Sequence, residues 1–87
     1  MGDPKVLAEI QRLAKLGRII FTAHAAKRMS TRGATARDVQ TALVSATDAT
    51  WQQDRENWRV SGGVDLDGDE LTVIVDLEAD VIVGTIF

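Results

Sequence analysis

In the first part of the chain, apolar side chains recur every three or four residues, which is the period of an amphipathic helix. Val6 and Ile10 follow this spacing. They come directly after Asp3 and Pro4, and a carboxylate followed by a proline is typical of a helix start. The pattern predicts a first helix over residues 4–16, which a glycine ends.

Two more helices are predicted in the residues that follow. Thr22 can cap a helix over residues 23–32, and a glycine comes directly after it. Thr35, with Asp38 three residues later, forms a short variant of the capping box and opens a helix that runs to about residue 47. The first half of the chain is therefore expected to contain two to three helices.

Beyond this point the period of the apolar side chains changes to two, which indicates strands. Turn sequences separate four strand candidates, at residues 49–53, 57–64, 70–77 and 81–87. Their connections are too short for parallel crossovers, so we expect an antiparallel meander. The last two strands are apolar on both faces and should be central in the sheet or covered by helices. The short apolar segment at residues 18–21 is either a small strand or an extended lead-in.

Together these elements predict an α+β fold in which the helices pack on a four-stranded antiparallel meander sheet. Residues 1–87 form a single domain, because a second core would have too little surface to bury. Since a core of this size is thin, a homodimer stays open as a source of added stability.

The composition excludes several kinds of site. The chain has no cysteine and a single histidine, which excludes disulfides, thiolate nucleophiles and histidine-rich metal sites within one chain. No apolar run approaches the roughly 20 residues that span a bilayer, and the N-terminal residues lack the apolar block of a signal peptide. We therefore expect a cytoplasmic protein with no membrane partner.

One segment of the sequence resembles a metal site, namely a calcium-binding loop. The alternating carboxylates of residues 65–70 resemble the start of such a loop, but no glutamate closes it at the twelfth position. A hairpin turn at Asp67–Gly68 explains the segment better. We expect neither a metal nor an organic cofactor.

The charges are distributed unevenly along the chain. The formal net charge is -3, but residues 1–40 carry eight lysines and arginines against three carboxylates, a net charge of +5. Residues 41–87 carry two arginines against ten carboxylates, a net charge of -8. This asymmetry can place a basic patch on an acidic protein, although most surface cations only aid solubility.

The segment "FTAHAAKRMSTRG", residues 21–33, is the main candidate for chemistry. On a helix, His24, Arg28 and Arg32 stand four residues apart on one face, with Lys27 beside them. The dipole at the helix start favours a neutral imidazole, which can accept a proton. A neutral base beside fixed guanidiniums suits metal-independent RNA cleavage, since the base takes the 2′-hydroxyl proton and the cations stabilise the charge on the phosphate. In the other interpretation His24 is structural, and the arginines pair with the acidic half.

The two tryptophans flank a turn. If the turn sequence forms a four-residue loop, Trp51 faces Val60, and Trp51 and Trp58 share one face of the sheet as diagonal neighbours. The tryptophans then either belong to the core or form a platform on which bases stack. Gln52 and Arg59 share the opposite face, where Arg59 can reach a phosphate or pair with a neighbouring carboxylate.

Two stretches carry a resemblance. "IIFTAHAAKRMSTRGATARDVQTAL", followed by "ENWRVSGGVDLDGDELTVIVDLEADVIVGTIF", resembles a family of small bacterial proteins of unassigned function. Its signature reads threonine or serine, any residue, histidine, alanine, then arginine-methionine and arginine-glycine, and the match covers about residues 18–87. The helix that ends in "LAKLGRI" adds a weaker likeness to MqsR-type toxins, which are similar to RelE-like ribonucleases that cut messenger RNA and are silenced by an antitoxin.

The resemblance implies a RelE/MqsR-like fold and a toxin-type endoribonuclease whose partners are RNA and an antitoxin. The hypothesis assigns catalysis to His24, Arg28, Arg32 and Arg59, and RNA contacts to Lys27, Gln52 and Trp58. The toxin family's active-site tyrosine and lysine have no counterpart here, and those toxins are typically basic. The alternative is a non-catalytic binding module of the same fold, which docks a partner through its acidic sheet half or its basic helix face.

Overall fold

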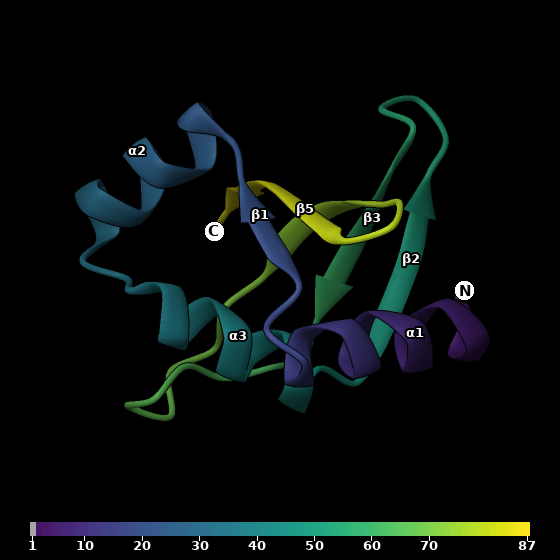
Figure 1. The fold of residues 1–87 in the computed structure, drawn as a ribbon, viewed down its shortest axis with the longest axis horizontal. Helices are drawn as coiled ribbons and strands as arrows, with labels where there is room; N and C mark the ends of the chain where they lie inside the picture. Colours follow the sequence, from purple (N-terminus) through teal and green to yellow (C-terminus); the bar gives the residue numbers. More distant parts are fainter. Residues whose placement is uncertain (1) are drawn as a thin grey trace.

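The structure is a computed structural model that describes residues 2–87. It contains three helices and five strands and belongs to the α+β class, as predicted (Figure 1). In chain order the elements are α1 (Pro4–Lys15), β1 (Ile19–Phe21), α2 (Ala23–Arg32), α3 (Ala36–Ser45), β2 (Asp48–Gln52), β3 (Asn57–Ser61), β4 (Val73–Leu77) and β5 (Val81–Ile86). Within the described residues, no helix has the length and apolar character needed to cross a membrane.

The sheet has five strands in the order β1-β5-β4-β3-β2, so the prediction of a four-stranded antiparallel sheet is wrong. Strands β2 to β5 pair antiparallel in chain order, but β1 joins the edge of β5 in parallel. Short connections exclude parallel pairing only between consecutive strands. The connection from β1 to β5 runs through two helices and three strands, which is long enough for a parallel pair. The last two strands do lie inside the sheet, as expected.

The helix starts follow the capping rules. The Asp3 side chain accepts hydrogen bonds from the backbone nitrogens of Lys5 and Val6, and Thr22 accepts one from Ala25. At α3, Thr35 and Asp38 form the complete capping box. The helix α3 ends at residue 45, two residues before the predicted end.

The core lies between one face of the sheet and the helices α1 and α3. Buried side chains of these two helices meet the apolar side chains that alternate along β2 to β5, including Ala49, Val60, Val73 and Val83. The helix α2 lies apart from α1 and α3, next to β1 and the end of β5 (Figure 1). It adds only Ala25 and Met29 to this core. The opposite face of the sheet keeps its polar side chains at the surface.

A buried carboxylate joins α3 to the loop between β3 and β4. Asp38 accepts hydrogen bonds from the backbone nitrogen of Thr35 at 2.8 Å and, through its other oxygen, from that of Leu66 at 3.1 Å. These two bonds, the one from Thr35 first, hold the pKa of the Asp38 carboxyl below its ordinary value of 3.8. The ionised carboxylate therefore stabilises the folded state.

We expect Asp38→Asn to lower the melting temperature at neutral pH, because the amide offers one acceptor oxygen in place of two. The folded-state pKa is depressed, so the stabilisation is present above pH 3.8 and is lost as the pH falls through the folded-state value. Thermal unfolding at about pH 7 and about pH 3 should show a large difference from wild type at the higher pH and a smaller one at the lower pH. Asp54→Asn, in the exposed loop between β2 and β3, serves as the control. An equal loss at both pH values would contradict the role of the charge.

Candidate functional site

A cleft of about 390 Å³ opens on the sheet face that α1 and α3 leave uncovered. Its lining comes from the start of α2, the β2–β3 hairpin, the start of β4, the end of β5 and the residue after β5. The lining residues are His24, Gln52, Arg55, Asn57, Arg59, Ile74, Gly84, Thr85 and Phe87. None of them is acidic, so the cleft favours an anionic ligand.

Strand register brings most of these side chains to one face. Gln52 pairs with Asn57, and its side-chain nitrogen donates to the Asn57 side-chain oxygen at 2.7 Å. Arg59 pairs with Ile74, which in turn pairs with Thr85. Paired residues of neighbouring strands point to the same face of the sheet. These side chains of β2, β3, β4 and β5 therefore lie on one face. The predicted common face for Gln52 and Arg59 is therefore observed.

The histidine enters the cleft from the start of α2. Thr22, which caps this helix, also fixes it to β5: its backbone nitrogen donates to the Val83 carbonyl at 3.0 Å, and its hydroxyl donates to the Gly84 carbonyl at 3.2 Å. His24 lies two residues further on, exposed, in the first turn. This anchor brings His24 into the same cleft as Arg59, 35 positions away in the sequence.

The other cations of the helix stripe do not line the cleft. Arg28 donates from Nε and Nη2 to the Ile86 carbonyl, at 3.4 and 3.3 Å, and Arg32 donates to the Glu70 carbonyl at 3.2 Å. Each step of four helical residues advances about 6 Å along the axis, so the stripe leads away from the cleft along α2. Arg28 lies beside the cleft, whereas Arg32 bonds to the β3–β4 connection. The prediction that the arginines clamp the helix to the sheet half is close to what is observed, with carbonyl oxygens in place of carboxylates.

The tryptophans lie on the other face of the sheet from the cleft. Trp58 is partly buried against the core, and Trp51 lies directly opposite it with ring centroids 5.1 Å apart. The predicted register, with Trp51 facing Val60, is wrong because the loop closes one residue earlier, at residues 53–56. Trp58 therefore does not reach a ligand in the cleft.

The closure of this loop depends on a strained residue. Glu56 has a φ of 54° and its backbone nitrogen donates to the Gln52 carbonyl at 2.7 Å. A left-handed conformation costs a residue with a side chain about 1–2 kcal/mol. The strain sits between Arg55 and Asn57, two cleft residues that the sequence analysis did not select. Their only signal was their place in the turn sequence next to Gln52.

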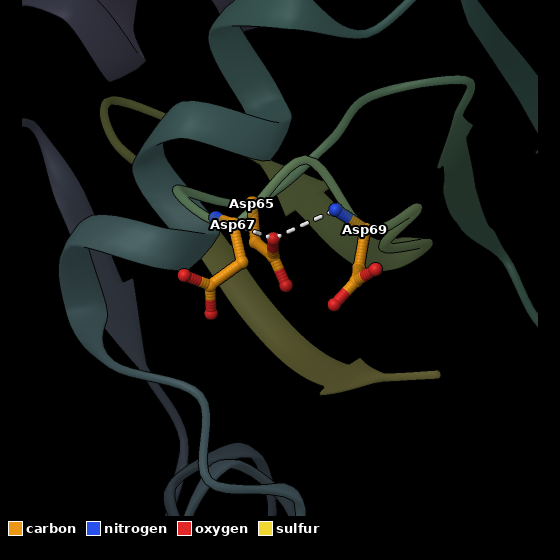
Figure 2. A group of neighbouring side chains, drawn as sticks. All are labelled: Asp65, Asp67 and Asp69. Atoms are coloured by element: carbon orange, nitrogen blue, oxygen red, sulfur yellow. Dashed lines mark hydrogen bonds between the residues drawn. The ribbon is translucent and has the colours of Figure 1, made fainter.

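The acidic loop between β3 and β4 forms a separate cluster. Carboxylate oxygens of Asp65, Asp67 and Asp69 lie within 4.8 Å of one another (Figure 2). One oxygen of Asp65 accepts hydrogen bonds from the backbone nitrogens of Asp67 and Asp69, both at 2.9 Å. Gly68 has a φ of 84°, which fits the turn predicted at this point. These bonds account for the position of the Asp65 side chain, and we assign the cluster no ligand.

Comparison of the chain with models of known protein families, with curated proteins and with solved structures gives no match. The resemblance to the small bacterial family and to the RelE/MqsR toxins therefore stays a prediction. Any functional interpretation depends on the cleft itself.

Proposed function

We propose that this protein is a metal-independent endoribonuclease of the toxin type, with a RelE/MqsR-like fold, that acts on single-stranded messenger RNA. The observation that carries the proposal is the presence of His24 and Arg59 in one cleft whose lining contains no carboxylate. Histidine is the side chain that takes up and returns protons near neutral pH, and arginine binds phosphate through a planar, permanently charged fork.

The chemistry needs few groups. His24 would accept the proton of a ribose 2′-hydroxyl, and the 2′-oxygen would attack the adjacent phosphorus. The bond from phosphorus to the 5′-oxygen breaks, and water, which reaches the open cleft, supplies the proton to the leaving 5′-oxygen. The products are a 2′,3′-cyclic phosphate and a 5′-hydroxyl end. Arg59 and Arg55 would stabilise the negative charge that builds up on the phosphate oxygens.

An antitoxin is the partner that this function implies. A protein that covers the cleft would have to present carboxylates to Arg55 and Arg59, since the lining offers them none. Binding of such a partner would exclude RNA from the same surface. The partner in the proposal is therefore an acidic segment that competes with RNA.

A second candidate function is a binding module that holds an anionic ligand without cleaving it. One observation favours it: within residues 2–87, no hydrogen bond orients the ring of His24, and a general base is usually oriented by a second group. In this alternative Arg55 and Arg59 still hold a phosphate, and His24 only adds to the cleft wall.

The test is incubation of the purified protein with a long unstructured RNA in the presence of EDTA. We expect fragments with 2′,3′-cyclic phosphate and 5′-hydroxyl ends, together with growth arrest when the protein is produced from a tightly controlled promoter. RNA that binds but stays intact would favour the binding module. RNA that neither binds nor is cut would overturn the endoribonuclease and would exclude RNA as the ligand of the binding module.

A further inference from the structure

Phe87 places an exposed aromatic ring in the cationic cleft. It lines the cleft together with His24 and Arg59, and 48% of the residue is exposed. Phenylalanine is among the residues most often buried. Its backbone is nevertheless fixed, since its nitrogen donates to the Thr72 carbonyl at 2.9 Å. This bond fixes the backbone from which the ring extends into the cleft.

Arg28 holds the ring from outside the cleft. Its guanidinium carbon lies 6.0 Å from the centre of the Phe87 ring, within the range of a cation–π contact. The two hydrogen bonds to the Ile86 carbonyl fix the guanidinium in this position. Arg28 does not line the cleft itself, but it contacts the Phe87 ring, which does.

We propose that Phe87, backed by Arg28, forms a nucleobase-binding subsite beside the phosphate-binding part of the cleft. An unpaired base stacks on the exposed part of the Phe87 ring. The phosphate next to this base lies at Arg59, and the ribose 2′-hydroxyl next to the phosphate lies at His24. Aromatic stacking accepts any base and requires that it be unpaired. The subsite therefore selects single-stranded over double-stranded RNA. This inference rests on the proposed function and adds the element that binds the base.

The exposed aromatic on the opposite face provides a matched control. Trp51 is 44% exposed, close to the value for Phe87, but it packs edge-on against Trp58 and does not line the cleft. If stacking depended only on an accessible ring, Trp51 would serve as well as Phe87. The cleft cations are what set Phe87 apart, because they bring a phosphate next to it.

The experiment measures binding of a short single-stranded RNA with one 2-aminopurine, whose fluorescence is quenched on stacking. All variants are made in the His24→Asn background so that the RNA stays intact. We expect Phe87→Leu, which keeps an apolar side chain without a π-face, to weaken binding by about tenfold and to remove the quenching. Phe87→Trp should retain both, and Trp51→Leu should leave both unchanged. A double-stranded RNA of the same sequence should bind more weakly than the single strand.

The results distinguish a failure of the subsite alone from a failure of the proposed function. If Phe87→Leu binds and quenches like the background protein while Arg59→Ala loses binding, the subsite is wrong and the phosphate-binding cleft stands. Equal affinity for single- and double-stranded RNA also overturns the subsite. If the background protein binds no RNA at all, the subsite and the proposed function fall together. Thermal unfolding of each variant confirms that the comparison is made between folded proteins.

Discussion

Replacement of His24 by asparagine is expected to slow RNA cleavage by about 10²–10⁴-fold, which is the usual contribution of a general base. Asparagine keeps a polar side chain of similar size at the start of α2 but cannot accept the 2′-hydroxyl proton. Because Thr22 caps and anchors the helix without help from His24, the fold should be unchanged. Initial rates of cleavage of a single-stranded RNA measure the effect. Binding of the same RNA should stay close to that of wild type.

Two further variants test whether a loss of cleavage by His24→Asn is specific to this side chain and separate from RNA binding. Ser30→Ala replaces another exposed polar residue of α2 that lies outside the cleft lining, and it should cleave like wild type. Arg59→Ala should weaken RNA binding and reduce its dependence on salt, with a change in slope of about 0.7 for one phosphate contact on a single strand. Cleavage at the wild-type rate by His24→Asn, combined with weak binding by Arg59→Ala, would show that the cleft binds phosphate and that the histidine has no catalytic part.

Local signals predicted most of the fold. Capping residues such as Asp3, Thr22 and Thr35 placed all three helix starts, because a cap is a short-range interaction between a side chain and the next few backbone nitrogens. The position of β1 was not predictable in this way. Residues 18–21 have no local feature that selects a parallel partner, and their place at the edge of the sheet depends on β5, some sixty residues later.

The candidate site was predictable in part. Spacing alone grouped His24 with Arg28 and Arg32, since helical period is readable from a sequence. It could not show that the stripe runs along α2 and that only its first residue enters the cleft. Arg59 was selected from strand alternation, which is also local, and the structure places it in the lining of the same cleft as His24. The sequence did not indicate that Phe87 lines the cleft, because the last predicted strand is apolar on both faces. Which of its side chains is exposed depends on the bulge between β4 and β5, which shifts the pairing of the two strands.

Gly63→Ala is expected to cause the largest loss of stability, about 3 kcal/mol. Gly63 is buried where the chain leaves β3 and passes the end of α3. A methyl group at this position would overlap the carbonyl oxygen of Ala42 and lie 2.7 Å from its carbonyl carbon. Backbone atoms within a helix cannot move aside as the end of a flexible side chain can. Next to a total stability of about 5–15 kcal/mol for a natural domain, this loss is large, and chemical denaturation with urea measures it.

Gly84→Ala is the matched control for this clash. It too adds a single methyl group to a glycine of the sheet half, but the nearest atom there is the carbonyl oxygen of Ile74 at 3.7 Å, an ordinary contact distance. Its free energy of unfolding should stay within about 1 kcal/mol of wild type, since alanine restricts the unfolded chain more than glycine does. A Gly63→Ala protein as stable as Gly84→Ala would contradict the close approach of this segment to α3. The hydrogen bond from the backbone nitrogen of Leu71 to the Gly63 carbonyl, at 3.0 Å, depends on the same approach. Loss of the glycine should therefore also loosen the acidic loop that this bond closes, which faster amide exchange at Leu71 would reveal.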